Sequence, residues 1–262
     1  MISNKVIWVT GASSGIGKAF VHYYNKKGYF VILSSRKKDS LDQVVKGLDT
    51  PENTFVQVLD LEDSNMFGEL TKDLIDRFGK IDVLVNNGGL SQRGNASETG
   101  LDIDRRIMEV NYFGNIALTK AVLPFMISAK SGHIIVISSI AGKFGFYLRS
   151  AYSASKHALQ GFYESLLLEE AKHNVFVTIA YPGKINTPIS VSALTATGDK
   201  HGEMDHNQKT GMSAEKCVAL IAKAAEKKKK SIVVGGKETK AVWIKRVFPS
   251  LFWRIIKNQK AT

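Results

Sequence analysis

Tyr152 and Lys156 have the side-chain types and the spacing for proton transfer. They lie four residues apart in a segment with a helical pattern, so both would point from the same face of a helix. A tyrosine hydroxyl has an ordinary pKa of about 10 and is a poor base at neutral pH, but a nearby ammonium group stabilises the phenolate and lowers that pKa. Such a pair suits the interconversion of a carbonyl and an alcohol, with the tyrosine moving a proton to or from the substrate oxygen.

Ser139 could hold the oxygen atom on which this tyrosine acts. It follows the apolar segment 133–138, which has the pattern of a strand, and ligands of open α/β sheets bind at the carboxyl ends of strands. Its hydroxyl can hydrogen-bond a substrate oxygen, while Lys156 could also hold the hydroxyls of a nicotinamide ribose. A Tyr-x-x-x-Lys spacing alone is most often an ordinary helix face, so the prediction depends on the elements around it.

Short β-branched runs alternate with helical patterns along the whole chain. Strands are predicted at 6–10, 29–34, 54–59, 82–86, 133–138, 175–181 and 231–234, and helices at 15–27, 40–47, 64–78, 102–129, 152–173 and 213–227. Apolar strands that alternate with helices indicate a parallel sheet covered on both faces. We therefore predict one α/β domain over residues 1–262, a doubly wound Rossmann-type sheet of about seven strands with helices on both faces.

The segment 188–212 breaks this alternation. It contains Gly202 and Gly211 and has little periodicity. A loop of this length in a compact domain is usually functional, so we expect an active-site lid. Two histidines and two acids also lie there, but nothing fixes a coordination geometry, so we expect no metal and interpret them as solvated loop residues: His201, Glu203, Asp205 and His206.

A glycine-rich turn at 10–17 lies between the first predicted strand and the first predicted helix. Gly11 permits a tight turn, Gly15 lets the backbone approach a pyrophosphate, and Gly17 lets helix and strand pack closely. The helix N-terminus then offers its N–H groups to phosphates. A plain glycine turn is the alternative, but the position between strand and helix favours a dinucleotide site, which also includes Ser13, Ser14 and Ile16.

The end of the second predicted strand bears on the choice of cofactor. An acid there would bind the 2′-hydroxyl of the adenosine ribose and repel a 2′-phosphate, but no acid occurs before Asp39. Arg36 can instead form a bidentate pair with a phosphate, with Ser35 donating a hydrogen bond and Lys37 adjacent. The sequence therefore favours NADP(H) over NAD(H). The alternative is that these are solvated residues at the start of a helix.

Two further strand ends complete the predicted adenosine side of the site. Asp60 and Leu61 end the third strand, where an adenine ring would lie, and Asn87 follows the fourth strand and could hold that region in place.

With these motifs in order, the chain resembles the short-chain dehydrogenase/reductase family over nearly its whole length. The matching motifs are the glycine turn at 10–17, the Asn-Asn-Gly-Gly run at 86–89, Asn111, the set Ser139, Tyr152 and Lys156, and Pro182-Gly183 followed by Thr187. One departure from the family pattern is Gly89, where alanine is usual, and it removes only a methyl group.

The resemblance implies roles for several of these residues. Asn111 would hold a water that links Lys156 to solvent as a proton relay. The run at 86–89 would support the adenosine side, with Asn87, Gly88 and Gly89 at the cofactor. The nicotinamide and its carboxamide would contact Pro182, Gly183, Ile185 and Thr187.

Within the family, the chain looks most like the member-seven-B subgroup of animal dehydrogenase/reductases. The similarity lies in the segments 108–114, 149–152, 155–158 and 192–205. Those animal proteins begin with a membrane anchor. We find no such anchor here, so the resemblance does not carry over a membrane location. For the subgroup, lipid-like or steroid-like carbonyl compounds are the usual suspected substrates.

Composition limits the remaining possibilities. The chain has 262 residues, 44% hydrophobic residues, a single cysteine and a net charge of +12. This suits an α/β domain with a full core and excludes an intrachain disulfide. We see no secretory signal and no apolar run long enough to span a membrane, so we expect a cytoplasmic protein. The basic residues are spread out and match no nucleic-acid module, so we expect no nucleic-acid partner.

The tail at 240–258 mixes aromatic and basic residues in two short helical pieces, with Pro249 opening the second. An apolar stripe repeats every four residues, at Trp243, Val247, Leu251 and Ile255. Two interpretations stay open: an interfacial helix on an anionic membrane, or packing against the substrate mouth or a partner subunit. We favour the second.

Together, these patterns predict an NADP(H)-dependent oxidoreductase that interconverts a carbonyl and a secondary alcohol on an apolar small molecule. Gln92 and Tyr147 are the expected substrate-side groups beside Ser139. The family resemblance implies a homodimer or homotetramer through the helices at 102–129 and 152–173. Two alternatives remain, a non-catalytic NADP(H)-binding scaffold and a protein that acts at a membrane surface through its tail.

Overall fold

The structure, a computed structural model, describes residues 4–258, so residues 1–3 and 259–262 of the predicted domain lie outside it. Its centre is a seven-stranded sheet in the order β11-β7-β6-β4-β1-β2-β3, and all its neighbouring strands pair in parallel. The strands are β1 (Val6–Thr10), β2 (Phe30–Ser35), β3 (Thr54–Val58), β4 (Val83–Asn86), β6 (Gly132–Ile137), β7 (Val175–Pro182) and β11 (Ser231–Val234).

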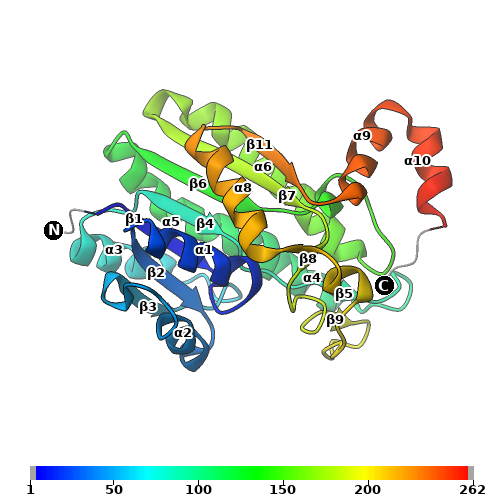
Figure 1. Ribbon diagram of the computed structural model, residues 1–262, viewed down its shortest axis with the longest axis horizontal. Helices are drawn as coiled ribbons and strands as arrows, with labels where there is room; N and C mark the ends of the chain where they lie inside the picture. The colour runs from blue at the N-terminus through cyan, green and yellow to red at the C-terminus, as the bar shows by residue number, and fades with distance from the viewer. Residues whose placement is uncertain (1–3, 259–262) are drawn as a thin grey trace.

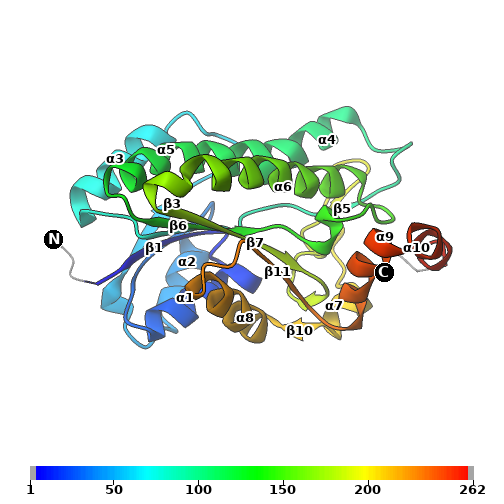
Figure 2. The ribbon, with the colours of Figure 1, turned by 90° about the horizontal axis from the view of Figure 1, so that it is seen from above.

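Helices cover both faces of this sheet (Figure 2). One face carries α1 (Gly15–Lys26), α2 (Lys38–Val45) and α8 (Ala214–Glu226), and the other carries α3 (Phe67–Phe78), α4 (Leu101–Met108), α5 (Gly114–Ser128) and α6 (Ser150–Glu170). Strand residues alternate between two cores: Ile7 and Val9 join the first, whereas Val6 and Trp8 join the second. The chain winds outward from β1 in both directions, which confirms the predicted doubly wound Rossmann-type sheet (Figure 1).

The segment predicted as one helix at 102–129 is interrupted. Between α4 and α5 the chain forms a π-helical turn, η2 (Glu109–Phe113), with Asn111 buried in its middle. A π-turn places one extra residue in the helix, and such turns occur often at functional sites. The hydrophobic pattern that predicts the helix does not reveal this turn.

Short elements occupy the loops at the carboxyl edge of the sheet. The segment 188–212 contains the strand β9 (Leu194–Thr195) and the helix α7 (His206–Lys209). β9 pairs with β5 (Gln92–Arg93), and β10 (Met212–Ser213) pairs with β8 (Ile185–Asn186). The segment is therefore tied to the body of the protein at both ends. The remaining 3-10 turns are η1 (Pro51–Asn53), η3 (Ile140–Gly142), η4 (Ala171–His173) and η5 (Lys237–Thr239).

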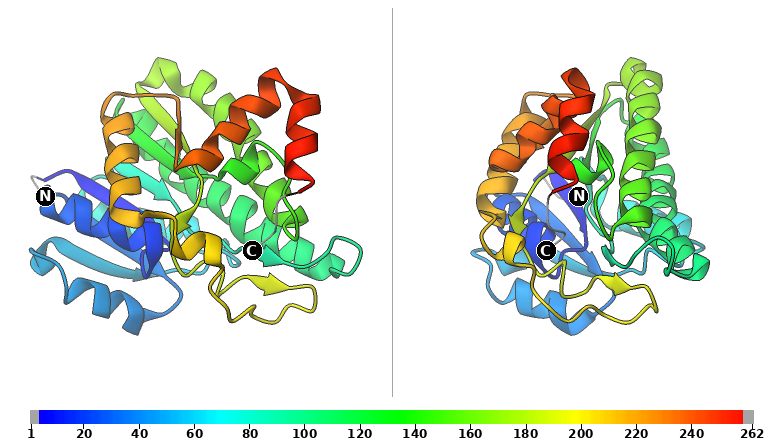
Figure 3. Two further views of the ribbon diagram at one scale, coloured as in Figure 1. Left: turned by 45° about the vertical axis from the view of Figure 1, so that its right-hand side comes forward. Right: turned by 90° about the vertical axis from the view of Figure 1, so that its right-hand side faces the viewer.

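The tail forms two helices, α9 (Lys240–Val247) and α10 (Pro249–Ile256), as the sequence predicts. They stand together beyond the carboxyl edge of the sheet (Figure 3). Phe252 is buried there, with its ring centroid 5.1 Å from that of Phe144, and Lys245 donates to the carbonyl of Lys143 over 2.9 Å. Within residues 4–258, no helix has the length and apolarity needed to cross a bilayer.

Candidate active site

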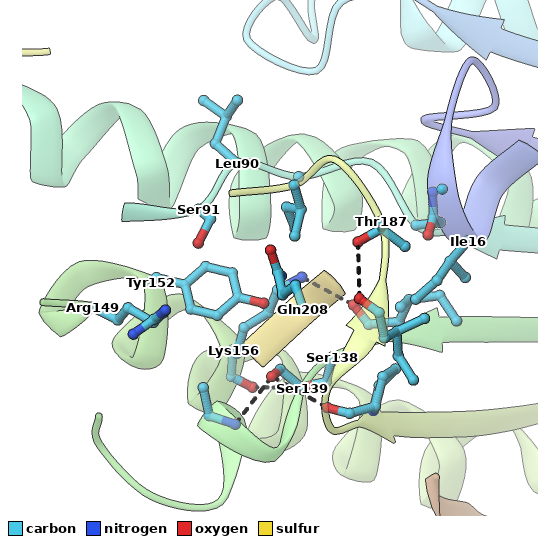
Figure 4. Close-up of a pocket in the computed structure, with 18 of the residues that line it drawn as sticks. Ile16, Leu90, Ser91, Ser138, Ser139, Arg149, Tyr152, Lys156, Thr187 and Gln208 are labelled. Carbon is cyan, nitrogen blue, oxygen red and sulfur yellow. Dashed lines mark hydrogen bonds between the residues drawn. The ribbon is translucent and has the colours of Figure 1, made fainter. Parts of the chain in front are cut away.

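A cavity of about 980 Å³ runs along the carboxyl ends of the strands. At one end it begins at the glycine turn after β1, and at the other it ends between the segment 188–212 and the tail helices. This is the edge of a doubly wound sheet at which ligands bind. Figure 4 shows how the polar side chains gather around Tyr152 in the middle of this cavity.

The glycine turn has the conformation that its residues require. Gly11 has a φ of +62°, a conformation that side chains rarely adopt, and a Cβ there would lie 2.8 Å from Nδ2 of Asn87. A Cβ on Gly17 would collide with the carbonyl oxygen of Gly11. Ser13, Ser14, Gly15 and Ile16 line the cavity together with Gly11, whereas Gly17 lies behind the turn and does not.

Asn87 holds this turn in place. Its Nδ2 donates to the carbonyl of Thr10 over 2.9 Å, and its backbone N–H donates to the hydroxyl of Thr10 over 3.0 Å. Gly88 donates to the same hydroxyl over 2.9 Å. Asn87, Gly88 and Gly89 all line the cavity, as do Asp60 and Leu61 after β3.

The end of β2 offers groups that fit an adenosine ribose and its phosphate. Ser35 and Arg36 line the cavity, whereas Lys37 does not. The hydroxyl of Ser35 is shielded from solvent and has no hydrogen-bond partner within residues 4–258. A buried, unpaired hydroxyl is unfavourable unless a ligand satisfies it, so this residue fits a bound nucleotide.

An acid that the sequence interpretation did not consider lies beside Arg36. Oε2 of Glu62 is 3.9 Å from Nη1 of Arg36, and the same carboxylate accepts from Arg106 over 2.9 and 3.1 Å. Arg36 and Arg106 both line the cavity here, together with Asp60, so two guanidinium groups are available to a bound phosphate.

Three of the four expected catalytic side chains line the middle of the cavity: Ser139, Tyr152 and Lys156. Ser139 follows β6 and begins η3, where its Oγ accepts from the N–H of Ala141 over 3.1 Å. Nζ of Lys156 lies 5.8 Å from the centre of the Tyr152 ring and donates to the carbonyl of Ile137 over 3.0 Å.

Burial shifts both titrating groups away from their charged forms. It raises the pKa of Tyr152 above its ordinary value, while a hydrogen bond with Ser139 and the charges of Arg149 and Arg93 lower it. Burial lowers the pKa of Lys156 to about 8. The pKa of Tyr152 therefore depends on how many cationic and hydrogen-bonding groups reach the hydroxyl.

Asn111, the fourth expected residue, is fully buried and does not line the cavity. Its Oδ1 accepts from the N–H of Leu90 over 2.7 Å, and its Nδ2 donates to the carbonyl of Leu90 and to the hydroxyl of Ser155. A Cβ on Gly89 would come within 2.9 Å of this Oδ1. The missing methyl at Gly89 therefore leaves room for the amide of Asn111, a consequence that the sequence comparison does not indicate.

The residues expected at the nicotinamide all line the cavity: Pro182, Gly183, Ile185 and Thr187. Pro182 ends β7 and the other three follow it, and Glu238 of η5 stabilises the turn by accepting from the N–H of Lys184 over 2.9 Å. The hydroxyl of Thr187 points toward the carbonyl of Ile185 at 3.5 Å.

The placement of Gln92 and Tyr147 corrects the expectation that they face the substrate, since neither lines the cavity. Gln92 is fully buried, and its Oε1 accepts from the N–H groups of Ala151 and Tyr152 at the start of α6. Tyr147 donates to the carbonyl of Lys257 over 3.1 Å. Gln92 thus caps a helix, because the first N–H groups of a helix need acceptors, and Tyr147 fastens the tail.

Sequence reasoning missed four polar residues around Tyr152, namely Arg93, Arg149, Asp205 and Gln208, all of which line the cavity. Asp205 is not a solvated loop residue, because both arginines pair with its buried carboxylate. Oε1 of Gln208 lies in the cavity beside Tyr152 (Figure 4) and has no hydrogen-bond partner within the described chain. One feature of the sequence could have drawn attention to two of them: Arg149 and Asp205 fall in segments shared with the suspected subgroup.

The sheet order and the groups at its carboxyl edge define a class: α/β oxidoreductases that bind a nicotinamide cofactor. Residues 5–197 match the family model described as short chain dehydrogenase. The chain belongs to the short-chain dehydrogenase/reductase family.

Named relatives place it within the family. It is 43% identical to a dehydrogenase/reductase SDR family protein 7-like of Anopheles gambiae, over 98% of this chain and 84% of that protein. It is 40% identical to the dehydrogenase/reductase SDR family member 7B of Mus musculus, over 98% and 82%. The chain is thus a member of the subgroup formed by the dehydrogenase/reductase members 7 and 7B.

Solved structures agree with the fold. A short-chain dehydrogenase from Streptomyces avermitilis matches over 97% of this chain and 96% of its own, with a TM-score of 0.82 and 31% identity. ElxO with NADP bound matches over 70% of this chain and 75% of its own, with a TM-score of 0.68 and 30% identity. A short-chain dehydrogenase/reductase from Burkholderia phymatum in complex with NAD shares the fold, with a TM-score of 0.83 over 100% and 98% of the two chains at 20% identity.

Proposed function

We propose that the chain is an NADP(H)-dependent oxidoreductase that interconverts a carbonyl and a secondary alcohol. The observation that carries this proposal is the meeting of Tyr152, Ser139 and Lys156 in one cavity that also contains the glycine turn. When bound, the nicotinamide supplies or accepts the hydride. Tyr152 donates a proton to the substrate oxygen in reduction and removes it in oxidation, while Ser139 hydrogen-bonds the same oxygen.

The remaining expected residues position these groups. Lys156 keeps Tyr152 in a cationic environment and holds the ribose hydroxyls, and Asn111 maintains the turn at Leu90 that forms the cavity wall. Asn111 also supports the proposed proton relay from Lys156. The side chain of Tyr152 is buried and lines the cavity, so a substrate bound there would displace water from around its hydroxyl.

The choice of NADP(H) rests on Ser35 and Arg36. One offers a buried hydroxyl without a partner and the other a guanidinium group, and both line the cavity at the end of β2. A 2′-phosphate would satisfy both, and Arg106, which is paired with Glu62, lines the same part of the cavity.

The substrate is an apolar carbonyl compound. The outer part of the cavity is walled by the aromatic and aliphatic side chains of Phe144, Phe146, Ile244, Phe252 and Ile256. Pockets of this composition favour ligands that bury apolar surface.

The tail contacts an anionic membrane surface from the cytoplasmic side. Most of its stripe faces outward: Trp243, Val247 and Leu251 are 45–60% exposed, and basic residues of the same two helices lie among them. Other residues of α9 and α10 line the cavity mouth, so an apolar substrate could pass from a bilayer into the cavity.

The central experiment combines purified protein with NADPH and a panel of apolar ketones, beside the variant Tyr152→Phe. Loss of the hydroxyl removes the general acid, so we expect kcat to fall by at least about 100-fold while NADPH still binds. Turnover that survives the substitution would remove Tyr152 from its assigned role. Binding of NADPH without turnover of any substrate by the unmodified protein would favour the non-catalytic scaffold instead.

A further inference from the structure

Three charged side chains from distant parts of the chain meet beside Tyr152. Arg93 comes from β5, Arg149 directly precedes α6, and Asp205 precedes α7 in the segment 188–212. Arg93 binds both carboxylate oxygens of Asp205, with its Nε 3.3 Å from Oδ1, and Nη2 of Arg149 lies 3.0 Å from Oδ2. Their side chains are 3%, 12% and 2% exposed, respectively. We refer to these three residues as the arginine cluster.

The arginine cluster belongs to the same cavity as the catalytic side chains. Arg149 is three residues before Tyr152 and immediately precedes α6, and both side chains line the cavity. Figure 4 shows the guanidinium of Arg149 beside the tyrosine ring, with Ser91 above them. The N–H groups of Ala151 and Tyr152 are fixed by Gln92, the neighbour of Arg93 in β5, so the geometry of this corner is constrained.

The charges of the arginine cluster act on Tyr152. Arg149 and then Arg93 oppose the effect of burial on the pKa of Tyr152. Burial and repulsion by Arg93 in turn lower the pKa of Arg149 to about 10. Lys156, on which sequence reasoning placed this effect, directs its ammonium to the carbonyl of Ile137. Its Nζ also lies 5.8 Å from the centre of the tyrosine ring, so in the described chain Arg149 and Arg93 add to the positive charge that Lys156 supplies near Tyr152.

We propose that Arg149 and Arg93, clamped by Asp205, are positioning residues that supply positive charge to Tyr152 and join that charge to the segment 188–212. This inference rests on the proposed oxidoreductase function. Asp205 allows the two guanidinium groups to lie together, because two buried like charges without an anion would repel each other. Since Asp205 leads into α7, the same ion pairs hold Gln208 in the cavity beside Tyr152.

Other ionisable groups lie near Tyr152, line the same cavity or contact the arginine cluster, and they must be kept in any test. They are Lys156 on α6 and, from the segment 188–212, Lys200 in the cavity wall and His201, whose Nε2 is 3.8 Å from Oδ1 of Asp205. Ser139 adds its hydrogen bond to the hydroxyl. None of these is altered in the variants chosen below.

The test compares the pH dependence of alcohol oxidation in Arg149→Gln, Arg149→Lys and Asp205→Asn. Oxidation needs the deprotonated tyrosine, and removal of a nearby positive charge raises the pKa of that group. We expect the rising limb of kcat/KM in Arg149→Gln to move to higher pH by roughly 0.5–1 unit. Arg149→Lys keeps the positive charge, so it should return the rising limb of kcat/KM to its original pH. Asp205→Asn should raise KM severalfold because the segment 188–212 loosens, without a shift to higher pH.

A second readout needs neither cofactor nor substrate. The ultraviolet titration of the protein minus that of Tyr152→Phe isolates the ionisation of this one tyrosine. The same difference taken in the Arg149→Gln background should move in the same direction as the kinetic limb. Arg105→Gln, an exposed arginine on α4 that does not line the cavity, is the matched control and should leave both readouts unchanged.

The outcomes separate this inference from the proposed function. If the unmodified protein turns over no alcohol, the proposed function fails, and the ultraviolet titration still tests the charge effect. If it turns over and Arg149→Gln keeps the original pH limb and the original titration, the arginine cluster only latches the segment 188–212. An equal shift in Arg149→Gln and Arg149→Lys would also overturn the inference, because the effect would then follow from shape rather than charge.

Discussion

At the scale of single residues, the site depends on side chains whose environment changes their ordinary chemistry. Burial raises the pKa of Tyr152, so the tyrosine alone is a poor base at neutral pH, and burial lowers the pKa of Lys156 to about 8, at which its ammonium form still predominates at pH 7. A hydrogen bond with Ser139 and two arginines counteract the effect on the tyrosine. The chemistry therefore belongs to a set of groups rather than to one spacing in the sequence.

Arg36 provides the residue-scale prediction on cofactor choice. Arg36→Ala removes a charge-assisted hydrogen bond to the 2′-phosphate, worth about 1.5–3 kcal/mol, so NADPH affinity should fall by roughly 10- to 100-fold. NADH lacks that phosphate, so its affinity in the same variant should stay within about twofold of the original value. Fluorescence titration with both nucleotides measures this, and an unchanged NADPH affinity would show that the phosphate lies elsewhere.

At the scale of elements, the carboxyl edge of the sheet gathers loops that are distant in sequence. β5 and β9 pair, β8 and β10 pair, and the tail helices pack on the turn after β6 through Phe252 and Phe144. These contacts close the outer part of the cavity. The tail packs at the cavity through Phe252, as the favoured interpretation expects, while exposed apolar residues such as Trp243 are the basis of the proposed membrane contact.

Vesicle binding tests the outward face of the tail. The double variant Trp243→Ala and Trp253→Ala removes two indole rings that are 60% and 54% exposed, so it should leave the fold intact. We expect the unmodified protein to pellet with phosphatidylserine-containing vesicles, and the double variant to bind at least about tenfold more weakly, because Trp anchors at the headgroup level. Leu168→Ala, an exposed apolar side chain on α6, is the control and should bind as the unmodified protein does.

The outcome that contradicts membrane contact is equally definite. If the protein, the double variant and a chain lacking residues 240–262 pellet equally, the stripe does not face a bilayer. Pelleting that persists with purely zwitterionic vesicles would show that the basic residues of the tail add nothing.

At the scale of the whole molecule, two cores on opposite faces of one sheet carry the stability. One titrating residue lies where β6 pairs with β7. The imidazole of His133 on β6 is hydrogen-bonded to the hydroxyl of Thr178 on β7 over 2.8 Å. Burial, with repulsion by Lys228, lowers the pKa of His133 from 6.5 to about 4. The folded state therefore holds this imidazole neutral at a pH where the unfolded chain protonates it.

The lowered pKa of His133 makes the folded state less stable as the pH falls. Between about pH 6.5 and pH 4 the unfolded state binds more protons at His133 than the folded state, so stability from this group falls as the pH falls through that window. His133→Gln cannot be protonated and should lose less of its thermal unfolding temperature between pH 7 and pH 5 than the unmodified protein. A parallel loss in both proteins would show that other groups dominate the acid response.

The sequence alone determined the sheet and the helices on both faces, and most of the site residues that it named line the cavity. This was possible because burial on both faces requires continuous apolar strands, and because a glycine such as Gly11 is needed where the backbone leaves ordinary φ values. Such requirements are local, so they can be read from the order of residues.

Only the tertiary structure decided the π-turn at Asn111, the capping role of Gln92 and the meeting of Arg93, Arg149 and Asp205 beside Tyr152. These depend on contacts between residues far apart in sequence, 112 positions for Arg93 and Asp205. For an arginine or an aspartate in a loop, the surrounding sequence looks the same whether the side chain is solvated or buried against a partner. Its function follows from which opposite charge the fold brings within reach, because only burial beside that charge fixes its position and its effect on a neighbouring pKa.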